Sequence, residues 1–308
     1  MLSTQALPNF DEVAGEMLAL LQKRLAFDLW MITRVEGNNW IVLYARGEGY
    51  SVCEGDVFHW PDSYCYRMVN HDAPRIIPDC AANTAYAQAP INESLPIGAY
   101  VGIPLTYSDG QLFGTLCAVH PQPMSQDITA ELPLLEVLAN MLGLILSVCL
   151  DVSGQARHKE QGEADRLRDD ETGLYNRCGW DYLLSREEQR CRLYGHSACI
   201  ISVQIHGSCD QMGRDRSGAS AEDIVKLAQI IQSTARKDDI VARVGERTFA
   251  ILVVESTLSD GKIFLERLQL YLRLAQLKTT TAIATRDRDQ YRLTTVWQQA
   301  QAATGAYP

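Results

Sequence analysis

The sequence lacks several features that would assign it to a special class of protein. Its nine cysteines are odd in number and never spaced as Cys-x-x-Cys, so neither a disulfide framework nor a structural zinc site is expected. Positive charge is scarce: 28 Lys and Arg against 38 Asp and Glu give a net charge of −10, and no local basic patch is visible, which argues against a nucleic-acid partner. Residues 1–11 contain no basic region followed by an apolar block, so no signal peptide is expected. Together these absences favour the cytoplasm.

One apolar run, residues 132–150, is long enough to cross a bilayer. Pro133, Glu136 and Asn140 interrupt it, and no Lys or Arg anchors either end. We therefore expect a helix that is buried on most faces, in a dimer, and a membrane span is the minor alternative.

The length of 308 residues, with 46% hydrophobic and 21% charged residues, suits two domains that each bury a core. The composition changes sharply at residues 155–170, which are dense in charge and poor in large apolar side chains. We place a first domain at 1–151, a solvated, charged helical linker at 152–168 and a second domain at 169–308.

Periodicity predicts the elements of both domains. The first domain has a helix over 9–27, where apolar residues recur at helical spacing, and strands over 29–35, 40–45, 100–106 and 112–120 that form two hairpins. The second domain has helices over 182–193, 220–236, 260–274 and 293–303 and strands over 198–205, 240–244, 249–254 and 279–285. The predicted fold class is α/β (α+β) with two domains, each a sheet with packed helices.

Residues 170–177, Asp-Glu-Thr-Gly-Leu-Tyr-Asn-Arg, resemble the segment that opens GGDEF domains, the diguanylate cyclases of bacterial signalling. The predicted elements over 169–303 follow in the order of that family. The resemblance implies a nucleotidyl-cyclase-like fold, with a sheet flanked by helices, in which carboxylates hold the divalent metal that activates GTP.

The signature of that family, Arg-x-Gly-Gly-Asp/Glu-Glu-Phe, falls on residues 243–249, where Gly245 and Phe249 are kept and Glu246 replaces the second glycine. The four positions that the resemblance assigns to metal-binding carboxylates hold Gln204, His206, Arg247 and Thr248. A guanidinium about 4 Å from Mg²⁺ would repel it by about 8 kcal/mol at an effective dielectric constant of about 20. We therefore expect no catalytic residue, no metal and no cofactor. The asparagine that contacts substrate in the family maps to about Met212, and an acidic guanine contact maps loosely to Glu222.

A second motif precedes the hairpin. Active cyclases of the family often carry a product-inhibition site, Arg-x-x-Asp. Arg236 and Asp239 stand in its register, with five residues, 240–244, between Asp239 and Gly245. An arginine pairs with phosphate or stacks on guanine, and an aspartate accepts from guanine, so with Arg243 these are candidate contacts for cyclic di-GMP. The alternative is structural: cations at a helix end and an aspartate in a helix-to-strand loop are common.

The first domain resembles a GAF domain, a small-molecule sensing and dimerising module with a central antiparallel sheet. The resemblance rests on residues 99–105, 109–110 and 114–118 of the second hairpin, and on 75–79, Tyr86 and Pro90. It implies a pocket between the sheet and its covering loops, with these lining candidates: Cys65, Tyr66, Asp79, Cys80, Tyr86 and Tyr100. Cysteines 53, 65, 80 and 117 are candidates for a thiol sensor, although the commoner role of such cysteines is that of small buried hydrophobic residues.

These observations predict a regulatory protein without catalysis, built as a parallel homodimer on the helices over 9–27 and 132–150. Its partners are cyclic di-GMP, at Arg236 and Asp239, or another protein of a signalling pathway. Two alternatives stay open: an adaptor that binds proteins and no nucleotide, and a metal-free GTP binder or weak diguanylate cyclase.

Overall fold

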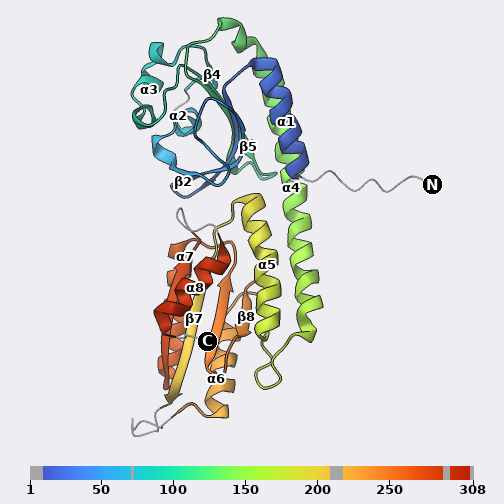
Figure 1. Ribbon diagram of the computed structural model, residues 1–308, viewed down its shortest axis with the longest axis vertical. Coiled ribbons are helices and arrows are strands. Elements are labelled where there is room, and N and C mark those ends of the chain that lie inside the picture. Colours follow the sequence, from blue (N-terminus) through green and yellow to red (C-terminus); the bar gives the residue numbers. More distant parts are fainter. Residues whose placement is uncertain (1–9, 71–72, 209–217, 287–291, 306–308) are drawn as a thin grey trace, which may run out of the picture. The chain divides into compact units, whose positions relative to one another are not determined.

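The computed structural model describes residues 10–70, 73–208, 218–286 and 292–305. The chain divides into two compact units, residues 1–153 with 193–195, and residues 154–192 with 196–308 (Figure 1). The boundary falls within two residues of the predicted end of the first domain.

The first unit contains an antiparallel six-stranded sheet in the order β3-β2-β1-β6-β5-β4. The strands are β1 (Leu29–Glu36), β2 (Asn39–Gly47), β3 (Val57–His59), β4 (Ile76–Ile77), β5 (Ala99–Thr106) and β6 (Leu112–His120). Helix α1 (Phe10–Leu25) and the first part of α4 (Leu132–Glu163) lie on one side of this sheet, and α2 (Tyr64–Asn70) and α3 (Thr84–Ala87) lie on the other (Figure 1). Because both faces are covered, the central strands are buried along nearly their whole length.

The second unit contains an antiparallel four-stranded sheet in the order β10-β7-β9-β8. Its strands are β7 (Cys199–Ser208), β8 (Ile240–Arg243), β9 (Thr248–Val253) and β10 (Leu277–Thr285), and its helices include α5 (Arg177–Tyr194), α6 (Ala221–Thr234), α7 (Leu258–Leu274) and α8 (Leu293–Thr304).

Alternate residues of the central strands face opposite layers of helices. On β7, Ile200 packs in the core that contains Trp180 of α5 and Trp297 of α8. Its neighbour Ile201 packs in the other core, with Phe264 of α7 and residues of α6. The period of two along these strands therefore produces a three-layer unit, as a sheet with helices on both faces requires.

The long predicted elements are confirmed, with shifts at their ends. Helix α5 begins at Arg177, five residues before its predicted start, and β7 extends to Ser208. The short elements β3, β4, α2 and α3 were not predicted, because two to seven residues are too few to show a period.

The charged linker differs from the prediction. Residues 152–163 are the end of α4, and a 3-10 turn, Ala164–Arg166, follows. The segment is helical as expected but not solvated throughout, since Arg157 is 7% exposed and Ala164 is 1% exposed. An arginine whose charge is matched by carboxylates can pack into a core, which composition alone does not reveal.

Helix α4 is also less buried in the single chain than predicted. One stripe, with Leu135, Ala139, Leu142 and Leu146, is buried in the first unit. A second stripe is exposed: Leu134, Val137, Met141, Leu144, Val148 and Val152. By length and composition, the helical stretch over Gln126–Arg166 would suffice to cross a membrane, and 28% of its most apolar window is buried.

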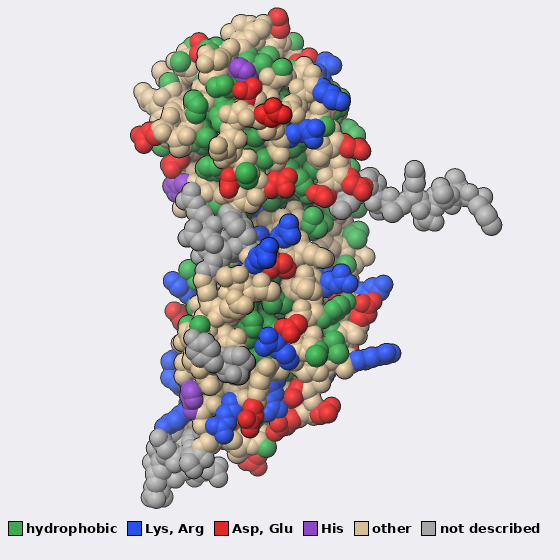
Figure 2. All heavy atoms as spheres, viewed as in Figure 1, with side chains coloured by type: hydrophobic (Ala, Val, Ile, Leu, Met, Phe, Trp, Pro, Cys, Tyr) green, Lys and Arg blue, Asp and Glu red, His purple; other side chains and the backbone are tan. Residues whose placement is uncertain are grey.

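Charge is mixed on the surface that Figure 2 shows. Lys and Arg side chains are interspersed there with Asp and Glu, and they do not join into a continuous basic surface (Figure 2). This face offers no broad basic surface of the kind that binds a nucleic-acid backbone.

Candidate nucleotide-binding site

The signature hairpin connects β8 to β9 through a turn over residues 244–247. The Val244 amide donates to the Thr248 carbonyl at 2.9 Å, and the Ile205 amide of β7 donates to the Arg247 carbonyl at 3.0 Å. Gln204 of β7 lies opposite Thr248 in the sheet register. Three of the four positions assigned to metal-binding carboxylates are therefore brought together at this end of the sheet.

The side chains at this end differ from a metal site in charge and type. Arg247 and His206 are exposed, and the Nε2 of His206 lies 2.7 Å from the Thr280 hydroxyl. Within the described residues, no three His, Cys, Asp or Glu side chains gather in a way that would hold a metal ion. Glu222 is exposed in the first turn of α6, and Met212 lies outside the described residues.

Arg243, the third candidate contact for cyclic di-GMP, instead joins the hairpin to the opening motif. Its Nη1 donates to Asp169 at 3.2 Å and to Glu171 at 2.5 Å, while Nη2 donates to the Glu246 carbonyl at 2.9 Å. Burial raises the pKa of Asp169, but hydrogen bonds from Thr172 and Arg243 outweigh that effect and lower it. Arg243 is not among the residues that line the pocket around Arg236.

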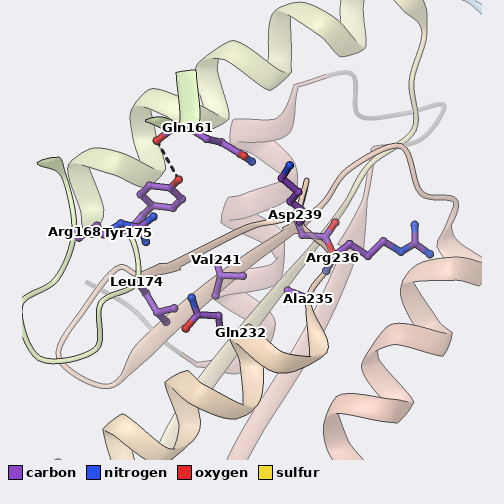
Figure 3. Close-up of a pocket in the computed structure, with 10 residues that line it drawn as sticks. Gln161, Arg168, Leu174, Tyr175, Gln232, Ala235, Arg236, Asp239 and Val241 are labelled. Carbon is purple, nitrogen blue, oxygen red and sulfur yellow. Dashed lines mark hydrogen bonds between the residues drawn. The ribbon is translucent and has the colours of Figure 1, made fainter. Parts of the chain in front are cut away.

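That pocket has a volume of about 270 Å³ (Figure 3). It brings together the loop after α6, the opening motif and the end of α4, with this lining: Gln161, Arg168, Leu174, Tyr175, Gln232, Ala235, Arg236, Lys237, Asp239 and Val241. Arg236 and Asp239 thus share one pocket. Sequence reasoning missed the contributions of Gln161, Arg168 and Tyr175, although Tyr175 stands inside the opening motif that marked this family.

Asp239 and Arg236 have different roles in the pocket. Asp239 is 6% exposed, and its carboxylate accepts from the Arg236 amide at 2.7 Å and from the Val254 amide at 3.3 Å. Burial raises the pKa of Asp239 despite these hydrogen bonds. Arg236 is exposed, and its side chain extends away from Arg168 and Tyr175 (Figure 3). The aspartate therefore holds the loop in place, and the arginine is available to a ligand.

The opposite wall of the pocket is aromatic and cationic. The guanidinium of Arg168 lies over the Tyr175 ring, 4.5 Å from the ring centroid. Its Nη2 donates to the Asp165 carboxylate at 2.6 Å. Such a stacked pair offers a planar face to a base and a charge to a phosphate.

The end of α4 completes the pocket and holds its loop. The Tyr175 hydroxyl donates to the Gln161 carbonyl at 3.3 Å, and the Gln161 side chain donates to the Asp238 carbonyl at 3.3 Å. His158, one turn earlier, lies 3.6 Å from the Asp238 carboxylate. These contacts tie the loop after α6 and the Tyr175 side chain to the end of α4.

In the first unit, the predicted pocket is filled by its own candidates. Cys65, Tyr86 and Tyr100 are at most 1% exposed, and the rings of Tyr86 and Tyr100 lie 5.3 Å apart. The Tyr64 ring packs on both, at 4.7 Å and 5.4 Å. These side chains are core, so they do not line an open site.

A smaller hollow of about 240 Å³ lies beside this aromatic cluster and is lined by Tyr64, Cys80, Ala81, Ala87, Asn92, Leu95, Pro96 and Ile97. Cys80 is the one predicted candidate among these lining residues. Tyr66 packs instead on Trp60, and Asp79 accepts from the Ala81 amide at 3.1 Å as the cap of a short turn.

The fold and the two motifs define a two-domain protein of the signalling class, with a sensor-type module followed by a cyclase-type module. A GAF domain model matches residues 9–146, and a model described as diguanylate cyclase, GGDEF domain, matches residues 166–301. The chain therefore carries a GAF domain followed by a GGDEF domain.

The probable diguanylate cyclase DgcC of Escherichia coli strain K12 is 32% identical over 101 residues, which cover 32% of this chain and 26% of that protein. Diguanylate cyclase DgcP of the same strain is 20% identical over 275 residues, covering 86% of this chain and 77% of DgcP. Among solved structures, the GGDEF domain of DgcB from Caulobacter crescentus in complex with c-di-GMP is 21% identical, covers 46% of this chain and 87% of that chain, and has a TM-score of 0.38.

Proposed function

We propose that this protein is a cytoplasmic, non-catalytic regulator whose GGDEF domain binds cyclic di-GMP at the pocket around Arg236 and does not make it. The main support for this proposal is that none of the four positions assigned to metal-binding carboxylates holds a carboxylate. Arg247 brings a positive charge to the hairpin, and Gln204 and Thr248 opposite each other in the sheet are neutral.

Loss of catalysis follows from the electrostatics of phosphoryl transfer. Joining two GTP molecules needs divalent cations to neutralise the charge that develops on the phosphates, and hard cations require oxygen ligands. The Arg243 guanidinium already binds the neighbouring carboxylates of Asp169 and Glu171, so these are committed to an ion pair. A metal at the hairpin would face Arg247, and none of the four metal positions would offer it a carboxylate.

Binding is supported by the composition of the pocket. Three cations, Arg168, Arg236 and Lys237, line a hollow that also presents the Tyr175 ring, in a chain of net charge −10. Phosphate pairs with the exposed arginine and lysine, and a base stacks on the Arg168 and Tyr175 pair. In this proposal Asp239 mainly positions the loop, because both carboxylate oxygens accept from backbone amides.

Titration calorimetry of the full chain with cyclic di-GMP tests the receptor function. We expect saturable heat with the wild type and a loss of at least tenfold in affinity for Arg236→Ala, since a charge-assisted hydrogen bond to phosphate is worth about 1.5–3 kcal/mol. Arg273→Ala, an exposed arginine on α7 outside the pocket, is the matched control and leaves the affinity unchanged. No heat with the wild type removes the receptor function and favours the adaptor.

We further propose that α4 pairs with α4 of a second copy. The exposed stripe Leu134, Val137, Met141, Leu144, Val148 recurs at steps of three and four residues, which is the spacing of a parallel two-stranded coiled coil. An unpartnered stripe of this length is unfavourable in water, and a second copy presents the same stripe in register. A monomer by light scattering at micromolar concentration would exclude this dimer.

A further inference from the structure

In the second unit, one helix carries the exposed apolar side chains. Among the residues of this unit that the structure describes, all the large hydrophobic side chains that are exposed lie on α7: Leu258, Ile263, Leu270, Tyr271 and Leu274. Leu274 is 73% exposed and Ile263 is 62% exposed, so neither belongs to the core of the unit. Apolar side chains gathered on one surface in this way mark an interaction site.

Helix α7 has one face for its own domain and a second face toward solvent. The first packs on β7 and β10 with these buried residues: Gly261, Phe264, Leu268 and Leu272. The second carries Ile263, Arg267, Leu270 and Leu274, which recur at steps of four, three and four residues. This is the spacing at which one helix packs along another. We call these four residues the α7 seam.

Arg267 is the charged member of the α7 seam, and its charge is turned away from it. Its Nη2 donates to the Thr234 carbonyl, at the end of α6, at 2.7 Å, and its guanidinium lies 5.6 Å from the centroid of the Phe264 ring. The guanidinium is thus held by its own domain, and the methylene stem remains between Ile263 and Leu270. The α7 seam therefore offers apolar groups along its whole length.

Two charged side chains beside the α7 seam indicate what fits it. Glu266 and Arg273 are exposed, and within the described residues neither forms an ion pair. They are seven residues apart, so they lie on the same side of the helix, two turns from each other. In a parallel pair of α7 helices each would face its own copy and repel it. In an antiparallel pair, each faces the opposite charge of the second copy.

We propose that α7 is a self-association surface, on which two copies of the chain pair through antiparallel α7 helices. A twofold axis that crosses the helix midway between Arg267 and Leu270 places Ile263 opposite Leu274 of the second copy. It also places the Arg267 stem opposite Leu270 of the second copy. Glu266 and Arg273 of the second copy then lie on the same flank, with an axial offset of about 3 Å, and the axis repeats this ion pair.

The α7 seam is separate from the exposed stripe of α4. Phe264 of α7 packs in the core on one face of the four-stranded sheet, whereas Ala164, in the turn after α4, packs in the core on the other face. A dimer paired through α4 therefore presents two α7 seams, which join it to further dimers. One helix pair of three turns is smaller than a standard protein interface, so a single α7 contact is weak and gains strength when copies are already paired.

Analytical ultracentrifugation of the full chain tests this contact, both in the wild type and with Leu144→Glu, which removes the α4 pair. With Leu144→Glu we expect a monomer at about 1 µM and a reversible dimer at about 100 µM and above, as suits one helix pair. Glu266→Arg and Arg273→Glu each weaken this association about tenfold or more, because two attractions per dimer become two repulsions. Arg192→Glu, an exposed residue of α5, is the matched control and leaves it unchanged.

Mixing the two variants separates this interface from non-specific association. An equimolar mixture of the Glu266→Arg and Arg273→Glu chains has opposite charges at both contacts, so it should associate at least as tightly as the unsubstituted chain, and the double variant should regain the same affinity. If the mixture stays as weak as either variant alone, or if the variants associate like Arg192→Glu, the antiparallel α7 pair is wrong. A chain that gives no association above the α4 dimer at any concentration also overturns it.

Discussion

The ion pair that fastens the end of α4 to the GGDEF domain gives a prediction that can be worked through from the structure. Arg157 is 7% exposed, and Glu187 of α5 is fully buried. The guanidinium donates to both oxygens of Glu187, at 3.2 Å and 2.9 Å, and also to Glu255 at 2.7 Å. Replacing Arg157 with methionine keeps most of the volume but leaves a buried carboxylate with fewer partners.

Breaking a buried pair by removing one partner costs about 3–5 kcal/mol. Arg190 still donates to Glu187 at 3.1 Å, so we expect the lower end, about 3 kcal/mol, for Arg157→Met. That corresponds to about 150-fold faster exchange of the protected amides in α5. The matched control is Lys159→Met on the same helix, since the Lys159 amine is 80% exposed and lies 3.9 Å from Glu163, a surface pair worth less than about 1 kcal/mol.

Hydrogen exchange measured by mass spectrometry on peptides from residues 177–194 reads this difference directly. It reports the GGDEF domain alone, whereas a single melting curve of a two-domain chain mixes two transitions. If Arg157→Met and Lys159→Met change exchange by the same small factor, the ion pair does not contribute as its burial requires, and the attachment of α4 to this domain is not electrostatic.

Three further predictions concern charge, packing and assembly. The pKa of Asp169 is lowered in the folded state, so its stabilisation is present above pH about 4 and is lost as the pH falls through the folded-state value. Melting of the GGDEF domain between pH 6 and pH 3 should therefore be less acid-sensitive in Asp169→Asn, and an unchanged acid dependence would contradict this. Gly102→Ala should destabilise the GAF domain by about 3 kcal/mol in urea unfolding, because its Cβ meets the Tyr100 hydroxyl, whereas Gly15→Ala in α1, where nothing lies within 4 Å, should stabilise it by up to about 1 kcal/mol. Leu144→Glu should convert the dimer to a monomer in light scattering, and a dimer of unchanged affinity would remove α4 as the interface.

The long elements were predictable from sequence because their apolar residues repeat often enough to show a period. Helices α1, α6, α7 and α8 and the central strands were all located to within a few residues. The segments β3 and β4 are two or three residues long, and their pairing partners fix them. Local propensity cannot identify an element whose stability comes from the neighbouring strand.

The candidate site was only partly predictable, because partners far apart in sequence decide what a side chain is free to do. Arg243 stands near the signature and looked available for phosphate, but Asp169 and Glu171, more than 70 residues earlier, bind it. Arg168 and Tyr175 line the pocket because the fold places them beside residues that are more than 50 positions later in the sequence. Residue type and register selected Arg236 and Asp239 as candidate contacts, and only the structure distinguishes the exposed arginine from the buried aspartate.

The same limit applied in the GAF domain. From the sequence, Cys65, Tyr86 and Tyr100 were predicted to line a cavity. In the structure they pack together in a buried cluster. A tyrosine that fills a cavity and one that lines it have the same sequence pattern, because both lie on the inner face of the sheet or its cover. Whether such a tyrosine fills or lines a cavity depends on how much empty volume the surrounding side chains leave.

We propose that the GGDEF domain has lost catalysis. Incubation of the purified full chain with GTP and Mg²⁺ or Mn²⁺, followed by chromatography of the products, tests it most directly, with an active diguanylate cyclase as the positive control in the same buffer. With Gln204, His206, Arg247 and Thr248 at the metal positions, we expect no cyclic di-GMP above the no-protein blank. Robust, metal-dependent formation of cyclic di-GMP by the wild-type chain would contradict the account.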